Sequence, residues 1–89
     1  LSNYSLVGQT RSINLGPKEF EIMRLLMSSP NVIVPKEDIL VKVWGTESDA
    51  EDNNVEVYIS FLRKKLRHLN ANVQIATVRK VGYRLEAKP

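Results

Sequence analysis

The side chains best suited to chemistry lie between positions 53 and 68, on the outer face of a predicted helix. At helical spacing this face combines amide, hydroxyl, apolar and cationic groups: Asn53, Val57, Ser60, Phe61, Lys64 and His68. Amides can pair with adenine edges, apolar groups can contact thymine methyls, and lysine or arginine can hold phosphates or guanine. The flanks add further amide, aromatic and charged groups: Asn54, Tyr58 and Lys65 on one side, Glu56, Arg63 and Arg67 on the other. These are the residue types that a duplex-binding surface needs.

Two aromatic residues on this helix leave a second interpretation open. Phe61 lies well away from the predicted core stripe, whereas Tyr58 lies nearer to it. Either ring could instead pack on neighbouring elements, with the nearby cations merely solvated. The exposure of the two rings separates these interpretations.

The charge distribution favours a polyanion-binding surface. Residues 1–56 carry five basic and nine acidic side chains, a net −4, whereas residues 57–89 carry eight basic and one acidic, a net +7. Such asymmetry suggests one surface for a polyanion and another for a different partner. Charge alone also fits a solvated basic face that has no partner.

Other classes of site find little support in the 89 residues, which suffice for one domain. The chain has no cysteine and a single histidine, so neither a disulfide framework nor a structural zinc site is expected. No apolar run approaches the roughly 18 residues of a membrane span, and the N-terminus lacks a signal-peptide layout. Asp49, Glu51 and Asp52 form the one conceivable acid/base cluster, but they lie in a predicted loop without a histidine or an apolar pocket. We therefore expect no enzyme activity, no cofactor, no metal and no membrane contact.

Two strands and a helix are predicted in the first third of the chain. Alternating apolar residues indicate strands at 4–7 and 10–15, separated by a turn at Gly8-Gln9. Gly16-Pro17 then opens a helix that ends within 28–31, because proline at the first helical position loses no hydrogen bond. Apolar residues cover most of this helix, which predicts a place in the middle of the core: Phe20, Ile22, Met23, Leu25, Leu26 and Met27.

A β-branched extended link at 32–34 leads to two further helices. The second helix is predicted from about Pro35 to Trp44, with Gly45 as its cap and Ile39, Leu40 and Val43 on its buried face. A polar acidic loop, 46–52, separates it from the third helix, which runs from about 53 to 68. The third helix has one apolar stripe for the core: Val55, Ile59, Leu62 and Leu66.

A hairpin of residues 73–79 and 82–86 ends the chain. Arg79-Lys80-Val81-Gly82 suits a type I turn followed by a bulge, with Gly82 in the left-handed conformation that valine avoids. This turn places Arg79 and Lys80 at the tip of a projecting loop. Three helices followed by a hairpin with a basic tip are the outline of an α+β winged helix-turn-helix.

Four stretches of the chain resemble the C-terminal effector domains of OmpR/PhoB-type response regulators, in the order and spacing of that family. They cover nearly the whole chain: Leu15 to Glu21, Val43-Trp44-Gly45, Asn54 to Leu66 and Thr77 to Leu85. The resemblance implies an N-terminal antiparallel sheet, three helices and a C-terminal hairpin. Family members usually have four strands in the first sheet, so we expect the first strand at or before Leu1. Because the chain begins with leucine, we expect a piece, residues 1–89, of a longer protein.

The resemblance also implies partners and a cellular setting. It implies a preceding receiver domain phosphorylated on aspartate by a sensor kinase, a cytoplasmic location, and head-to-tail pairs on direct repeats of double-stranded DNA. The third helix enters the major groove, and the wing, about 75–86, meets the adjacent backbone or minor groove. In some members the loop matching 46–52 touches RNA polymerase, which here places Glu47, Asp49, Glu51 and Asp52 in a polymerase-contact loop.

Individual DNA-binding positions are carried over in the same way. The slots that face bases fall on Asn54, Val57 and Phe61. Phosphate contacts fall on residues of the second and third helices: Trp44, Asn53, Tyr58, Ser60, Arg63, Lys64 and Lys65. The wing contacts fall on Thr77 and Arg79, and Lys80 adds charge beside them.

Three departures from the family pattern bear on function. Ser60 and Phe61 occupy slots that often hold arginine, which favours T·A-rich contacts. Lys80 replaces a common wing glycine, and Pro35 replaces a serine cap. Two other functions stay open: a winged-helix module that binds an acidic protein, and a regulator of the same fold that is not controlled by phosphorylation.

Overall fold

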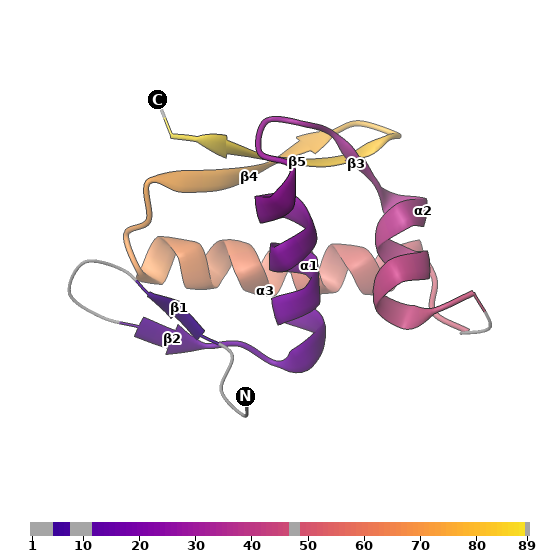
Figure 1. Ribbon diagram of the computed structural model, residues 1–89, viewed down its shortest axis with the longest axis horizontal. Coiled ribbons are helices and arrows are strands. Elements are labelled where there is room, and N and C mark those ends of the chain that lie inside the picture. The colour runs from indigo at the N-terminus through magenta and orange to yellow at the C-terminus, as the bar shows by residue number, and fades with distance from the viewer. Residues whose placement is uncertain (1–4, 8–11, 47–48, 89) are drawn as a thin grey trace.

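The computed structural model describes residues 5–7, 12–46 and 49–88, and three helical segments lie between two small sheets (Figure 1). Two strands, β1 (Ser5–Val7) and β2 (Ser12–Asn14), pair antiparallel with Leu6 opposite Ile13. They confirm the short N-terminal sheet. The predicted Gly8-Gln9 turn lies outside the described residues.

Helix α1 spans Pro17–Ser28 and begins after Gly16, as the Gly-Pro pair predicts. The Gly16 N–H donates to Oε1 of Glu19 at 2.7 Å, so this glutamate caps the helix although it is almost fully buried. The expectation that apolar residues are buried all round this helix is wrong for Met27, which is 57% exposed. Ile22, Met23 and Leu26 form the buried face, and Met27 lies outside it near the end of the helix.

The second helix is divided. Its first turn, α2 (Lys36–Ile39), is α-helical, and η1 (Leu40–Trp44) continues it as a π-helix. Gly45 ends it at φ 92°, and its N–H donates to the carbonyls of Leu40 and Val41, which confirms the predicted cap. Pro35 at the N-terminal cap provides no side-chain hydrogen bond, as its replacement of a serine implied.

Helix α3 spans Asp52–His68 and runs along the longest dimension of the molecule, with α1 crossing it (Figure 1). All four residues of the predicted stripe are at most 4% exposed, so the 3.6-residue periodicity located the buried face correctly. They join residues of α1 and the C-terminal hairpin in one core, which includes Ile22, Leu26, Ile75 and Leu85.

The predicted hairpin is formed by β4 (Val73–Val78) and β5 (Gly82–Ala87). A third strand, β3 (Val34–Pro35), pairs with the other side of β5, giving the order β3-β5-β4. Sequence patterns predicted this segment only as an extended link, because two residues carry too little alternation to identify a strand. The three-stranded sheet and the three helical segments complete a winged helix-turn-helix.

The predicted conformation of the hairpin turn is wrong at one residue. Lys80, with φ 65°, adopts the left-handed conformation, and Gly82 does not. The Val81 N–H donates to the Val78 carbonyl at 3.0 Å, and Val78 pairs with Gly82, so the turn closes one residue earlier than expected. Gly82 is required for another reason: an added Cβ would lie 2.0 Å from the carbonyl oxygen of Val34.

Candidate nucleic-acid interface

The outer face of α3 is exposed to solvent, and the opposite apolar stripe is buried in the core. Phe61 and Val57 are 43% and 47% exposed, which is high for large apolar side chains. The polar residues expected beside them are also exposed: Asn53, Asn54, Ser60, Lys64 and His68. The exposure of Phe61 excludes the interpretation that it is a core residue.

Phe61 lies at the end of a row of three aromatic rings, which continues through Tyr58 to Trp44. The rings of Tyr58 and Phe61 meet edge to face with centroids 5.7 Å apart, and those of Trp44 and Tyr58 meet at 5.5 Å. Nζ of Lys18 lies 5.4 Å from the Trp44 ring. Tyr58 and Trp44 are half-buried, so Tyr58 packs on neighbouring rings while part of its side chain stays accessible. The row joins η1 to α3 and fixes the orientation of the exposed ring.

The first turn of α3 engages one of the proposed base-facing residues. Oδ1 of Asn54 accepts a hydrogen bond from the Glu51 N–H at 2.8 Å. Its amide oxygen therefore caps the helix. The amide NH₂ is the group of Asn54 that can donate to a base.

Three consecutive cations of α3, expected together as phosphate contacts, point to three different places. Lys64 is exposed on the outer face. Nζ of Lys65 lies 2.6 Å from Oε1 of Glu19 and 3.0 Å from the carbonyl oxygen of Asn14, which ties α3 to the start of α1. Arg63 is half-buried and bonded to β4. Sequence reasoning missed these internal partners because they are far away in the chain.

The wing tip is basic and exposed, in agreement with the predicted hairpin. Arg79 and Lys80 project into solvent beside Val81, which is 46% exposed. The Lys36 N–H donates to the Val81 carbonyl at 3.0 Å, so the start of α2 holds the tip. Lys36, absent from the predicted site, also lines an open cavity of about 460 Å³ with Lys80.

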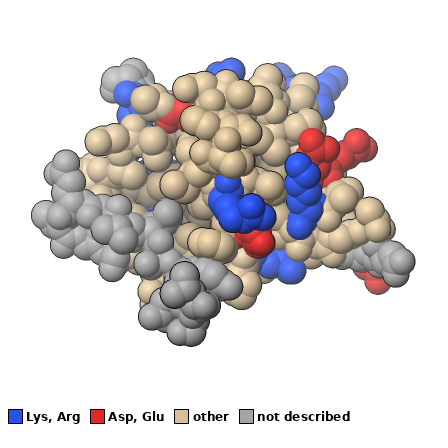
Figure 2. All heavy atoms as spheres, in the orientation of Figure 1, with Lys and Arg blue, Asp and Glu red and all other residues tan. Residues whose placement is uncertain are grey.

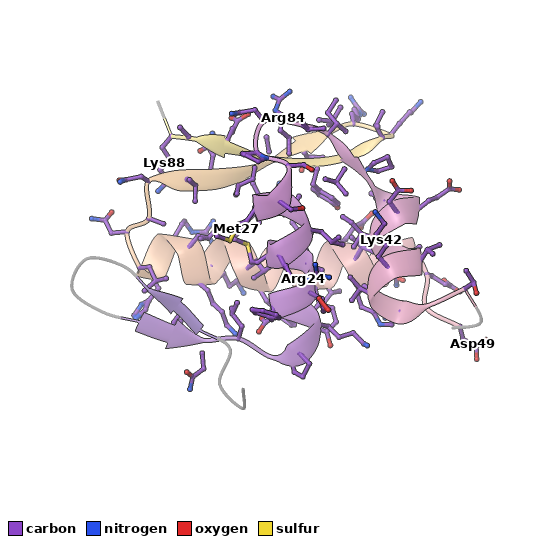
Figure 3. All side chains as sticks on the ribbon, in the orientation of Figure 1. Arg24, Met27, Lys42, Asp49, Arg84 and Lys88 are labelled. Carbon is purple, nitrogen blue, oxygen red and sulfur yellow. The ribbon has the colours of Figure 1, made fainter. Side chains whose placement is uncertain are left out.

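The acidic loop lies at one end of the molecule. Asp49 and Glu51 are exposed, whereas Glu47 and the side chain of Asp52 lie outside the described residues. Asp49 is found beside the start of α3, and Lys88 lies at the opposite end (Figure 3). On the face crossed by α1, basic groups are isolated and interspersed with acidic ones (Figure 2). Among the described residues visible on that face, the basic groups do not form a stripe.

One carboxylate of the hairpin is strongly hydrogen-bonded. Nε2 of Gln74 donates to Glu86 at 2.9 Å, and the Arg84 guanidinium donates to the other carboxylate oxygen at 3.0 and 3.1 Å. The Gln74 bond, followed by the Arg84 bond, lowers the pKa of Glu86 below its ordinary value. This contact links β4 to β5 on the wing.

A metal site and a membrane span are the other features that bear on function. Within residues 5–7, 12–46 and 49–88, three or more potential metal-ligating side chains do not come together anywhere. Among the described helices, none has the length and apolar character that crossing a bilayer requires.

Comparison with known proteins agrees with this geometry. The family described as "Transcriptional regulatory protein, C terminal" matches residues 9–85. The transcriptional regulatory protein DltR of Streptococcus agalactiae is 42% identical over 86 residues, which is 97% of this chain and 38% of DltR. The chain thus spans less than half the length of this relative.

Two solved structures have the same architecture. The C-terminal domain of the nisin resistance regulator NsrR superimposes with a TM-score of 0.81 at 32% identity, covering 100% of this chain and 91% of that one. The DNA-binding domain of Klebsiella pneumoniae RstA, solved in complex with the RstA box, superimposes with a TM-score of 0.72 at 29% identity. The match covers 86% of this chain and 77% of the RstA domain.

Proposed function

Because this chain belongs to the family of C-terminal domains of OmpR/PhoB-type transcriptional regulators, we propose that it binds double-stranded DNA with sequence preference. Helix α3 enters the major groove, and the β4–β5 wing contacts the adjacent backbone or minor groove. RstA, a similar structure solved with its DNA box, supports this assignment.

One observation carries the proposal: α3 exposes two large apolar side chains between amide and cationic groups. Val57 and Phe61 are exposed on the same helix, and their apolar side chains suit contacts with thymine methyl groups. Lys64 lies on the same face for phosphate contact. Asn54 completes the base-facing set through its amide nitrogen, since its oxygen is bonded to the Glu51 backbone.

The remaining predicted DNA-binding positions fall into two groups, exposed residues and residues that support them. Asn53, Ser60, Lys64, Arg79 and Lys80 are exposed and available for phosphate contacts. Trp44 and Tyr58 support the exposed face, and Thr77 lies on the wing near Arg63. We assign no catalytic step and no cofactor to this domain.

The role of the whole protein extends the same proposal. We infer an effector domain, residues 1–89, attached to a receiver that a sensor kinase phosphorylates, in a cytoplasmic regulator that binds direct repeats as head-to-tail pairs. Contact with RNA polymerase through the acidic loop belongs to this inference, and so does the absence of any membrane contact. The length of DltR, of which this chain covers 38%, leaves room for such a receiver.

The decisive experiment is selection of bound duplexes from a random pool, followed by salt titration of the enriched sequence. We expect one repeated motif to be enriched, with affinity falling steeply as salt rises. A matched pair of variants tests the surface: Val57→Asp should abolish binding, whereas Val32→Asp, a similarly exposed valine outside α3, should lower it only slightly. Failure to enrich any sequence, or equal loss in both variants, would contradict the proposal and favour a protein partner.

A further inference from the structure

One arginine of α3 binds the outer strand of the wing. Strand β4 is an outer strand of the β3-β5-β4 sheet, so it has backbone groups on its free edge. Nε and Nη2 of Arg63 both donate to the carbonyl oxygen of Ile75, at 3.0 and 2.8 Å. Nη2 also donates to Oγ1 of Thr77 at 2.7 Å. One side chain of α3 therefore binds β4 at two residues, through the backbone carbonyl of Ile75 and the side-chain hydroxyl of Thr77.

The geometry of these bonds uses the shape of the guanidinium group. The Nε proton and both Nη2 protons point to β4, and the group lies 5.9 Å from the centroid of the Tyr83 ring on β5. The two bonds to the Ile75 carbonyl are partly buried, which strengthens them relative to exposed ones. A lysine could not reproduce this arrangement, because its ammonium group is a point donor on a flexible stem.

Apolar contacts between α3 and the hairpin are less directional. Leu66 and Ile75 are both buried in the shared core, and apolar packing tolerates small rotations. The hydrogen bonds of Arg63 join α3, two residues after Phe61, to β4, two to four residues before the wing tip that bears Arg79 and Lys80. They can therefore set the distance and angle between the two surfaces that would meet DNA.

We infer that Arg63 is a positioning residue, which holds the wing in register with the reading helix instead of binding a phosphate directly. This inference rests on the proposed function and refines it at one position. It predicts that the contributions of Arg63 and Arg79 to DNA affinity are coupled. Once Arg79 is removed from the wing, loss of Arg63 should lower DNA affinity only slightly. A direct phosphate contact would make the two contributions independent.

The test is a double-mutant cycle on the duplex recovered by selection. Arg63→Lys keeps the charge, and we expect it to weaken binding about tenfold in the wild-type background but less than about threefold beside Arg79→Ala. Arg67→Ala, the loss of a neighbouring exposed arginine of the same helix, is the matched control and should be additive with Arg79→Ala. Wild-type affinity for Arg63→Lys, or multiplicative effects of Arg63→Lys and Arg79→Ala, would overturn the inference.

A second measurement needs no DNA. Amide hydrogen exchange in the β4–β5 hairpin should become about tenfold faster in Arg63→Lys and should not change in Arg67→Ala. Thr77→Val removes one of the acceptors from the wing side and should shift exchange in the same direction. If the wild-type chain enriches no duplex, the proposed function fails, while unchanged hairpin exchange in Arg63→Lys and Thr77→Val would refute the positioning role by itself.

Discussion

At the scale of single residues, Phe61 shows what a short stretch of sequence can and cannot settle. Its position opposite the apolar stripe predicted exposure, and it is 43% exposed. Its aromatic support could not be predicted, since Trp44 comes from a different helix and reaches Phe61 only through Tyr58. The periodicity of a helix gives the direction of a side chain but not the neighbours that other elements bring to it.

Replacement of Phe61 by alanine should separate DNA recognition from stability. We expect Phe61→Ala to change the free energy of unfolding by no more than about 1 kcal/mol, because an exposed side chain leaves no cavity. The preference at one or two base pairs should flatten, while non-specific affinity, which phosphates supply, stays similar. Ile59→Ala, in the adjacent buried stripe, should cost about 2–5 kcal/mol. Thermal melting of both variants checks the difference, and a large loss for Phe61→Ala would place its ring in the core.

Glu86 gives a prediction about pH at the same scale. Gln74 and Arg84 lower its pKa, so its carboxylate stabilises the fold above its unfolded pKa, and this contribution is lost as the pH falls through the folded pKa. In an NMR titration, the Glu86 carboxyl should titrate below the ordinary glutamate value of about 4.3. Gln74→Leu should raise that midpoint, because it removes the hydrogen bond with the largest effect. An unmoved midpoint would show that the Gln74 bond does not form in solution.

At the scale of elements, the helices were predictable and the hairpin turn was only partly so. Caps and periodicity located α1 and α3 within one or two residues, because the signals for them lie inside each segment. The predicted turn conformation was wrong because Gly82 is required by its contact with β3, which lies far away in the sequence. Pro35 of β3 pairs with Gly82, 47 residues later in the chain. A glycine in a turn has two possible reasons, positive φ or close approach, and a single sequence does not distinguish them.

Lys80 should be strained, and the strain can be measured. A side chain in the left-handed conformation costs roughly 1–2 kcal/mol, which glycine avoids. The greater freedom of glycine in the unfolded chain offsets part of that advantage. We therefore expect Lys80→Gly to raise the free energy of unfolding by about 1 kcal/mol. Lys80→Ala, which removes the same charge but keeps a Cβ, should be no more stable than the wild-type protein. Denaturant titration of the pair checks this, and equal stability of the two variants would contradict the left-handed assignment.

Gly82 provides the opposite case within the same turn. Alanine here has no φ penalty, but its Cβ would lie 2.0 Å from the carbonyl oxygen of Val34 and 2.7 Å from Cα of Pro35. Since these are backbone atoms, β3 must move away from β5, and we expect Gly82→Ala to cost about 1–3 kcal/mol of stability. Melting that stays close to wild type would mean that β3 does not pair with β5 in solution.

At the scale of the whole molecule, the separation of charge seen in the sequence becomes a separation in space. The acidic loop, with Asp49 exposed, lies beside the start of α3 (Figure 3). The cations of the C-terminal third lie mainly in α3 and the hairpin. The sum of charges could be read from the chain, but the internal use of Arg63 and Lys65 could not. Fewer cations therefore remain for DNA than a count of residues 57–89 suggests, and this lowers the number of phosphate contacts to expect.

This separation predicts opposite effects of the acidic loop on binding and on transcription. Replacing Glu47, Asp49 and Glu51 by alanine removes three negative charges, so DNA affinity should hold or rise slightly, most clearly at low salt where screening is weak. Activation by the full-length regulator should fall if the loop contacts RNA polymerase. Arg24→Ala and Lys42→Ala together serve as the reverse control, since they lower the positive charge outside α3 and the wing. Loss of DNA binding in a folded loop variant would show that the loop itself lies against the duplex, because the removal of negative charge cannot weaken attraction to phosphate by electrostatics alone.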